Sequence, residues 1–472
     1  MRKLMMLAAH EPSLDPRIKW EAHSASREYD VTVVGFNDNP EKQHKDETFK
    51  TIRLERNLHQ GLFTFIVEIK KILESSLKIR ALYFLSLIAL FFLGPPFIIT
   101  QKIAMKLKDI IRKTDLFKTL LKSILFHEKL VPAYSTIAKM YSIAAIYYGT
   151  CIHFITTGSV FWKYIERNQH PDIIHCNDLD TLIVGVIAKR KFGTKIIYDA
   201  HEFWPYSSTQ TPKLLVTLLK LYENFLIKYP DSVITVNHYL ADAMKQEYDL
   251  NYIHSIPNCE PWHNSSSNPT QIDFSACNFS QCKVKFLYQG NFYRGRGIEV
   301  LINTWKELNP KEASLFIRGT SSKHYHECLL LAEETKLLNK SIFFLDAVRE
   351  DELVSAASFY DVGIIPYEPV SINNRFSCPN KLSQYMHAGL AIISNKLDYV
   401  SEILTLYNIG VIYDSSEPIT LINAFQFYIN NPSQLSLHKK NALNAAENHF
   451  NWQVQEKILL QIYHDLYPFD HK

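Results

Sequence analysis

The chain has 472 residues, of which 47% are hydrophobic and 21% are charged, and its formal net charge is +3 at pH 7. This length exceeds a single ordinary hydrophobic core and predicts two domains of about 200 residues each, together with an additional segment. The near balance of charge gives no general case for a nucleic-acid partner, so none is expected.

The seven cysteines are scattered along the chain, and no two of them have the spacing of a Cys-x-x-Cys pair. Such a pattern is typical of reduced thiols in a cytosolic protein and indicates neither a zinc site nor a disulfide framework. The N-terminus carries Arg2 and Lys3, but the apolar run that follows them stops at His10 and is too short for the core of a signal peptide. We therefore expect a cytoplasmic protein that begins with a strand.

The N-terminal segment predicts a parallel α/β unit. We expect a buried strand over residues 3–9, a loop and helix start over residues 10–23, and a second strand over residues 31–36. Since the loop follows the carboxyl end of a strand, it lies where such folds bind ligands. Asp15 and Arg17 belong to this loop. Taken singly, each has an ordinary structural role as an equal alternative to ligand binding: Asp15 as a helix cap and Arg17 as its exposed neighbour. The loop has no glycine-rich phosphate turn, which disfavours a dinucleotide oxidoreductase.

Residues 57–169 interrupt the alternation of strands and helices. Within them, residues 81–99 are apolar and uncharged, but Gly94-Pro-Pro96 breaks the run, and a simple membrane-spanning helix needs about 20 residues. A second apolar stretch, residues 140–162, is expected to pack within the first domain.

Residues 102–122 have an apolar stripe at helical spacing with cations beside it. These cations are Lys102, Lys106, Lys108, Arg112, Lys113, Lys118 and Lys122. An apolar wedge next to an amphipathic basic helix is typical of an interfacial anchor, so we expect residues 79–122 to bind an anionic membrane surface. The alternatives are an insertion packed on the first domain with a solvated basic face, and a true span or re-entrant hairpin.

The alternation of strands and helices resumes at residue 172. A strand there runs into Asn177 and Asp178, and the strand that begins at Lys195 runs into His201 and Glu202. Because carboxyl ends of parallel strands meet at one edge of a sheet, these four side chains point into the same crevice. His201 and Glu202 are the acid, base and hydrogen-bond candidates of this half, although a loop histidine is often structural.

The second half begins after residues 259–282, whose Ser, Asn and Pro content is typical of a linker. Residues 284–298 predict a strand, a glycine-bearing loop and a helix. Gly290 lets a ligand approach the backbone closely, and Arg294 and Arg296 suit paired hydrogen bonds to phosphate oxygens. A basic surface turn is the alternative for this loop.

The segment Cys378-Pro-Asn-Lys-Leu-Ser-Gln-Tyr-Met-His-Ala-Gly-Leu-Ala-Ile-Ile-Ser394 predicts a turn, a helix and a buried strand. The amide groups of the first helical turn have no partners within the helix. Asn380 and Lys381 add a neutral donor and a positive charge at the same place, so this helix start favours an anion.

These segments resemble the retaining glycosyltransferases of family 4. The resemblance is carried by Pro379-Asn-Lys-Leu-x-x-Tyr-Met-x-Ala-Gly-x-x-x-Ile393, Tyr198-Asp-x-His-Glu202, Ser13-Leu-Asp-Pro-Arg17 and the loop 290–297. It implies an α/β protein of GT-B architecture, in which two Rossmann-like domains face each other across a cleft. The implied parts are a first domain, 1–258, with the insertion 57–169, the linker 259–282, a second domain, 283–440, and a C-terminal helix, 441–472, that crosses back to the first domain.

The resemblance also implies site residues. The catalytic set is His201, Glu202, Arg296 and Lys381; the donor-binding set is Gly290, Asn291, Arg294, Arg296, Arg318, Asn380, Lys381 and Gln384; and the acceptor-binding set is Asp15, Arg17, Asn177 and Asp178. The donor is a nucleotide-diphosphate sugar, and no further cofactor is implied. No paired acidic ligands stand out, so the leaving diphosphate is expected to be stabilised by cations and amides without a metal.

The chain departs from the family pattern at several positions. The loop after the first strand has no paired glycines, and Asn291 and Arg296 occupy the positions of the family's arginine and lysine. Phe376 and Gln384 occupy the positions of two glutamates, the second of which accepts hydrogen bonds from the ribose. Gln384 can still bond a hydroxyl, but the charge-assisted contact is lost, and such contacts are roughly twice as strong as neutral ones. Weaker donor binding, a different donor or inactivity would follow.

Three hypotheses remain open. The first is a membrane-surface glycosyltransferase of polysaccharide or glycolipid assembly that acts on a saccharide or lipid-linked acceptor. The second is a carbohydrate-binding or scaffold protein that has lost turnover, which Phe376 and Gln384 motivate. The third is a sugar-nucleotide epimerase of the same fold, which the membrane-like insertion disfavours.

Overall fold

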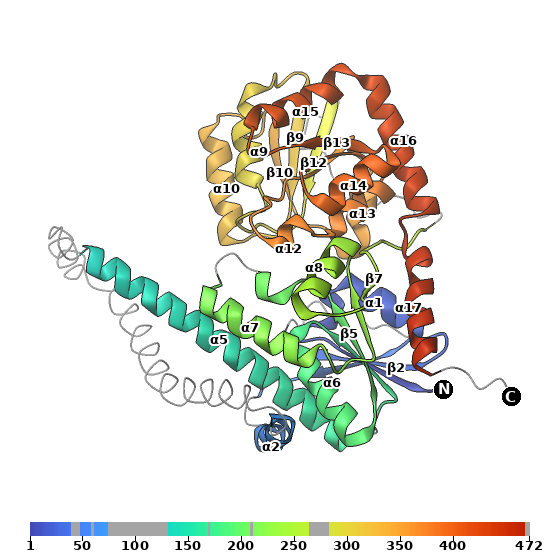
Figure 1. Ribbon diagram of the computed structural model, residues 1–472. Coiled ribbons are helices and arrows are strands. Elements are labelled where there is room, and N and C mark those ends of the chain that lie inside the picture. The colour runs from blue at the N-terminus through green and yellow to red at the C-terminus, as the bar shows by residue number, and fades with distance from the viewer. Residues whose placement is uncertain are drawn as a thin grey trace. The chain divides into compact units, whose positions relative to one another are not determined.

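The computed structural model describes residues 1–38, 48–57, 61–73, 131–168, 170–207, 211–263 and 283–467. Its strands form two parallel sheets, in the order β3-β2-β1-β4-β5-β6-β7 and β10-β9-β8-β11-β12-β13 (Figure 1). Helices connect most of the successive strands of each sheet, so the predicted fold class, α/β with two Rossmann-like halves, is confirmed. The apolar run 81–99 and the basic segment 102–122 lie outside the described residues.

The first sheet contains seven strands. They are β1 Lys3–Leu7, β2 Asp30–Phe36, β3 Lys50–Leu54, β4 Ile173–Asn177, β5 Lys195–Ala200, β6 Ser232–Thr235 and β7 His254–Ser255. The helices of this half are η1 Pro12–Leu14, α1 Pro16–Ala25, α2 Leu62–Leu73, α5 Val131–Arg167, α6 Leu179–Phe192, η3 Trp204–Tyr206, α7 Lys213–Leu226 and α8 His238–Tyr248. Strand β3 was not predicted from the sequence. It lies at the edge of the sheet and contains the charged residues Lys50 and Arg53, so it lacks the continuous apolar pattern of the central strands.

The second sheet contains six strands. They are β8 Val284–Gln289, β9 Ala313–Arg318, β10 Ile342–Leu345, β11 Val362–Ile365, β12 Ala391–Asn395 and β13 Gly410–Tyr413. The helices of this half are α9 Ile298–Thr304, η4 Trp305–Glu307, α10 Lys323–Glu334, η5 Glu350–Glu352, α11 Leu353–Ala357, α12 Ile372–Arg375, α13 Asn380–His387, α14 Asp398–Tyr407, α15 Pro418–Asn430, α16 Pro432–Asn448 and α17 Trp452–Leu466. Its central strands are buried on both faces, which explains their continuous apolar sequence.

By its internal contacts the chain divides into two compact units. One comprises Met1–Pro12, Thr32–Ile196 and Gln210–Pro230, and the other comprises Ser13–Val31, Ile197–Thr209 and Asp231–Lys472. The domain boundaries drawn from the sequence stay a prediction. Within the second unit, α17 packs on α1, where the rings of Trp452 and Trp20 lie 5.8 Å apart.

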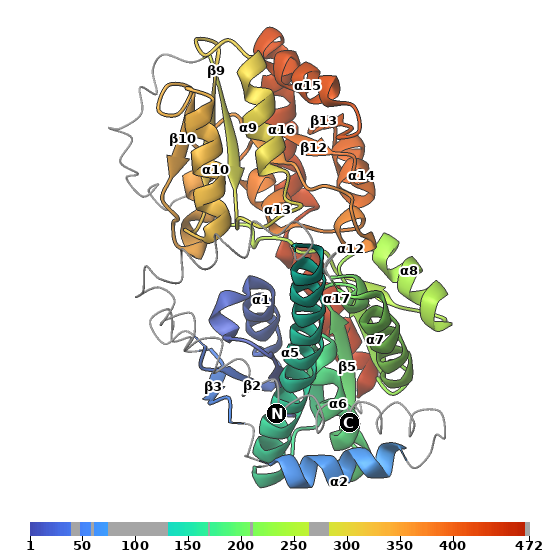
Figure 2. The same ribbon diagram turned by 90° about the vertical axis from the view of Figure 1, so that its left-hand side faces the viewer.

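Helix α5 contains most of the second apolar stretch. Its C-terminal part is buried, with Phe161 and Trp162 fully enclosed, and α2 crosses it there (Figure 2). The crossing is close because a Cβ at Gly158 would lie 2.1 Å from the Phe65 ring. The portion Ile143–Arg167 is also long and apolar enough to cross a membrane, by length and composition alone.

Candidate functional site

The N-terminal end of α13 brings a buried cation to the second sheet. Lys381 is 5% exposed, and its Nζ lies 2.9 Å from the hydroxyl oxygen of Tyr367 and 4.7 Å from the ring centre of Tyr288. The Arg296 guanidinium lies 3.9 Å from the ring centre of Tyr367. Two cations therefore share one tyrosine. Among the described residues, neither cation has a carboxylate within 4 Å.

The glycine at the end of β8 lies directly against this cation. Gly290 has φ +145°, and a Cβ at this position would meet Nζ of Lys381 at 3.0 Å. Only glycine therefore leaves room for the ammonium group and for a ligand oxygen beside the backbone. The structure brings together three of the predicted donor residues: Gly290, Arg296 and Lys381.

The charges around Tyr367 determine its protonation and that of Lys381. Burial lowers the pKa of Lys381, Tyr367 raises it and Arg296 lowers it further. Burial raises the pKa of Tyr367, but Lys381 and Arg296 outweigh burial and leave it lowered. An anion placed beside both cations would relieve their mutual repulsion, because it favours the charged form of each. The arrangement is therefore suited to bind a diphosphate.

A chain of amide groups extends from Arg318 to Glu260. Nη1 of Arg318 donates to Oε1 of Gln289 at 2.9 Å, and Nε2 of Gln289 donates to Oε1 of Gln384 at 3.3 Å. Nε2 of Gln384 then donates to Oε1 of Glu260 at 3.2 Å. Burial raises the pKa of Glu260 to about 7, and the bond from Gln384 lowers it in part. The sequence reasoning missed Glu260, because it stands at the edge of a segment with no periodicity.

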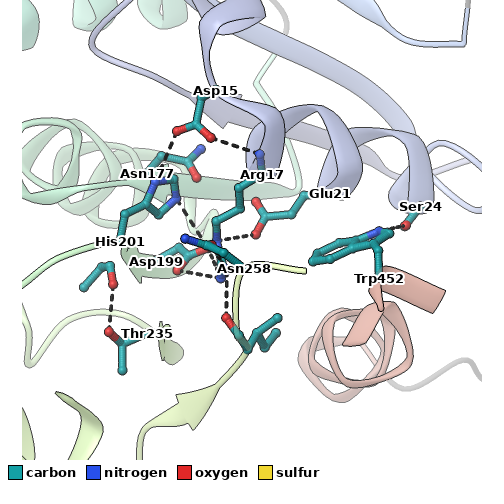
Figure 3. Close-up of polar contacts among 12 residues, drawn as sticks. Asp15, Arg17, Glu21, Ser24, Asn177, Asp199, His201, Thr235, Asn258 and Trp452 are labelled. Atoms are coloured by element: carbon teal, nitrogen blue, oxygen red, sulfur yellow. Dashed lines mark hydrogen bonds and ion pairs between the residues drawn. The ribbon is translucent and has the colours of Figure 1, made fainter. Parts of the chain in front are cut away.

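His201 lies between two carboxylates in the second unit. Its Nδ1 is 3.3 Å from Oδ2 of Asp15, and its Nε2 is 3.7 Å from Oδ2 of Asp199 (Figure 3). Asp15 also caps α1, since its Oδ1 accepts from the backbone nitrogen of Arg17 at 3.0 Å. Asp15, predicted to bind the acceptor, and His201, predicted to be catalytic, are thus brought together from two different elements.

Arg17 is buried at the start of α1 and is 2% exposed. Its Nε and Nη2 bond the Asp199 carboxylate, and its Nη1 donates to the Ile256 carbonyl at 2.7 Å and to Asn258 (Figure 3). Its Nε also lies 3.0 Å from Oε1 of Glu21. The pKa of the Glu21 carboxyl is raised well above its usual value, first by burial and second by the nearby charge of Asp199. The guanidinium therefore joins α1 to β5 and to the segment after β7. Its assignment to the acceptor stays a prediction.

Glu202, Asn177 and Asp178 are the other predicted polar residues of the first half. Oε2 of Glu202 accepts a hydrogen bond from Asn373 at 2.7 Å. Asn177 is buried and its Nδ2 donates to the Leu7 carbonyl at 3.1 Å. Asp178 has φ 63° and ψ 167°, a positive-φ extended conformation that favours glycine, so its backbone is strained. Both lie at the end of β4, as predicted.

The remaining donor candidates lie away from the paired cations or are held by other groups. Arg294 is 72% exposed, and its Nη2 lies 3.4 Å from Oε2 of Glu327. Asn291 is exposed and accepts from Thr320 at 3.3 Å. Arg318 is buried, and Asn380 is the first residue of α13. Their part in donor binding stays a prediction.

Two family models match the chain. The model described as Glycosyltransferase Family 4 matches residues 126–259, and the model described as Glycosyl transferases group 1 matches residues 283–431. Together they cover more than half of the sequence. The chain belongs to the GT-B glycosyltransferases of these families. No curated protein matches the chain.

Solved structures of transferases share the fold over almost the whole chain. Sucrose-phosphate synthase from Thermosynechococcus elongatus has a TM-score of 0.65 and 14% identity, with 99% of each chain covered. A glycosyltransferase from Rickettsia africae ESF-5 has a TM-score of 0.61 and 11% identity, with 99% of each chain covered. HepE of Anabaena, solved in complex with UDP-glucose, has a TM-score of 0.61 and 12% identity over 98% of this chain and 100% of that one.

Proposed function

We propose that the chain transfers a sugar from a nucleotide-diphosphate sugar to a saccharide or lipid-linked acceptor, with retention at the anomeric carbon. The observation that supports this most is the pair of cations on Tyr367. Lys381 is almost fully buried and Arg296 lies on the same ring, and no carboxylate among the described residues neutralises them. Buried charges without a partner are costly, so a site of this kind is maintained for an anionic ligand.

The proposed chemistry follows from where charge develops during transfer. As the glycosidic bond to the donor breaks, negative charge grows on the leaving diphosphate, and fixed cations stabilise it without reorganisation. Lys381 and Arg296 supply those cations, and the amides of the first turn of α13 supply neutral donors. No step requires a metal ion at the diphosphate. His201 would contact the sugar at the opposite side of the reaction.

A uridine nucleotide is the first donor to test, because HepE was solved with UDP-glucose. Gln384 is predicted to bond a donor hydroxyl through its amide. A carboxyl group stands nearby in Glu260, whose Oε1 lies 3.2 Å from Nε2 of Gln384 and whose pKa burial raises to about 7. We therefore expect donor hydroxyls to be bound by the amide and the carboxyl together.

The decisive experiment measures donor hydrolysis and transfer with Lys381→Met and Arg296→Met across a panel of nucleotide sugars. We expect kcat to fall about 10²-fold to 10³-fold in each variant, as on removal of a group that stabilises developing negative charge. Lys396→Met is the matched control, because Lys396 is 69% exposed and pairs with Asp414. Full activity of both site variants would overturn the proposal.

A second candidate is a protein that binds the nucleotide sugar without turnover. Phe376 favours it, since an aromatic ring replaces a carboxylate at this position and stacks on Tyr239 at 5.7 Å. Calorimetric binding of UDP and UDP-glucose separates the two candidates. Nucleotide binding with no product from any donor would support the binding protein.

We further propose that the chain acts at the inner face of the cytoplasmic membrane. The support is the composition of residues 79–122, an apolar run followed by a basic amphipathic segment. The triple change Lys106→Glu, Arg112→Glu and Lys113→Glu should release the protein from vesicles that contain anionic lipid. Cosedimentation equal to that of the wild type would contradict surface attachment.

A further inference from the structure

We propose that Glu299, His324 and Cys328 bind a divalent transition-metal ion of the zinc type, which joins α9 to α10. The two helices lie side by side in the second half of the chain (Figures 1 and 2). His324 and Cys328 are four residues apart on α10 and therefore project from the same face, and Glu299 lies in the first turn of α9. The proposal does not depend on the transferase activity.

The ligand atoms have the spacing of one coordination sphere. One atom from each of the three residues lies within 4.8 Å of the others. Nε2 of His324 is 3.1 Å from Oε1 of Glu299 and 3.9 Å from Sγ of Cys328. A tetrahedral zinc ion with ordinary bond lengths separates its nitrogen, oxygen and sulfur ligands by about 3.3 to 3.7 Å. Small side-chain movements would therefore complete the site.

The other nitrogen of His324 is also held by a carboxylate. Its Nδ1 lies 3.0 Å from Oε2 of Glu327. A neutral imidazole has a single N–H, so it can donate to only one of the two facing carboxylates. With the proton on Nδ1, the neutral ring presents the lone pair of Nε2 to the Glu299 carboxylate, and a proton or a metal ion between these two atoms would bind both. A carboxylate on the far nitrogen is the arrangement that orients metal-binding histidines.

The position of Cys328 favours the metal ion over the proton. Its side chain is fully buried, and Sγ faces the same nitrogen that faces Glu299. A proton on Nε2 would satisfy Glu299 alone, whereas a metal ion would bind the oxygen, the nitrogen and the sulfur together. When it binds, the thiol releases its proton to solvent and coordinates as the thiolate.

The donor set determines which ion would bind. One sulfur, one imidazole nitrogen and one carboxylate oxygen suit zinc and disfavour calcium or magnesium, which prefer oxygen ligands. Three protein ligands leave a fourth position for water. Because Glu327 also pairs with Arg294 at 3.4 Å, a bound ion would help to fix the end of the loop that precedes α9.

The test uses the full chain, stripped with a chelator and titrated with Zn²⁺ against a chromophoric competitor. We expect one tightly bound ion in the wild type, and with Co²⁺ an absorption band from thiolate-to-cobalt charge transfer. Cys328→Ser should abolish that band, and Glu299→Gln should weaken Zn²⁺ binding at least tenfold. Glu299 is 39% exposed, so its variant keeps the fold even if Cys328→Ser does not.

His326→Ala is the matched control, because His326 lies on the same helix and contacts Ser321 instead of the cluster. Its Zn²⁺ affinity should equal that of the wild type. Absence of a stoichiometric ion in the wild type would overturn the proposal. Equal Zn²⁺ affinity in the wild type, Cys328→Ser and Glu299→Gln would overturn it as well.

Discussion

The side-chain amide of Gln384 donates a hydrogen bond to Glu260, with Nε2 3.2 Å from Oε1. The carbonyl oxygen of the same amide accepts a hydrogen bond from Gln289, which in turn accepts one from Arg318. Gln384 therefore connects Glu260 to a series of buried hydrogen bonds that begins at Arg318. Glu260 ends this chain, and burial raises its pKa to about 7. A carboxyl group that keeps its proton in the folded state affects stability in the opposite direction to an ordinary carboxylate.

Glu260→Gln is expected to reduce the pH dependence of stability. The unfolded carboxyl ionises near 4.5, whereas the folded one keeps its proton to about 7, so the folded state binds more protons between these values. The stabilisation that protonated Glu260 gives to the folded state is complete below the unfolded pKa and decreases as the pH rises to about 7. The total decrease is at most about 3 kcal/mol. Urea unfolding at about pH 5 and about pH 7.5 measures this loss. The permanently neutral glutamine should lack it, while Glu312→Gln, at a surface pair with Lys283, should behave as the wild type.

Asp15→Asn is expected to lower kcat without lowering stability. Asparagine caps a helix as well as aspartate does, so the bond to the Arg17 amide is kept. The charge that faces Nδ1 of His201 is lost, and we expect kcat to fall about tenfold or more. A lower melting temperature with unchanged kcat would assign Asp15 a purely structural role.

Arg17→Met is expected to destabilise the fold by about 3 to 5 kcal/mol, because it removes the guanidinium that bonds the buried Asp199 carboxylate through two nitrogens. Chemical unfolding followed by circular dichroism measures the change. Arg27→Met is the comparison, since Arg27 is 60% exposed in its pair with Glu456 and should cost at most about 1 kcal/mol. Similar losses in the two variants would contradict a special role for the buried arginine.

Trp452→Phe is expected to cost about 1 to 2 kcal/mol by removing one hydrogen bond while keeping an aromatic ring. Nε1 of Trp452 donates to Oγ of Ser24 at 2.8 Å, and that hydroxyl donates to Glu456 at 2.6 Å. A double-mutant cycle with Ser24→Ala, followed by urea unfolding, should show coupling between the two sites. Strictly additive effects would mean that this bond contributes nothing to stability.

The sequence predicted the strands of both sheets wherever burial on two faces produced a continuous apolar run. Thus β1 and β2 were expected over residues 3–9 and 31–36, and they are observed over Lys3–Leu7 and Asp30–Phe36. Strand β3 was missed, because its exposed edge permits Lys50 and Arg53. Patterns of apolar residues report burial, so they indicate the core more reliably than the edges.

The site was predicted less completely than the fold. Lys381 and Gly290 were identified because a helix start and a glycine turn have local signatures. Tyr367, the shared partner of Lys381 and Arg296, has no such signature, since its role comes from the position of its ring against both cations. Glu260 was missed for the same reason. The proposed metal ligands were missed because Glu299 comes from a different helix than His324 and Cys328, and only the fold brings them together.

The packing of α17 on α1 has a consequence for biosynthesis. Helix α1 is made before α17, and Trp452, which begins α17, is separated from Ser24 on α1 by 428 residues. Until then the indole that bonds Ser24 is missing, and the apolar face around Trp20 stays open to solvent or to chaperones. The packing around Trp20 is therefore completed only after α17 has been made, and a nascent chain stalled before this helix should be a substrate for proteolysis.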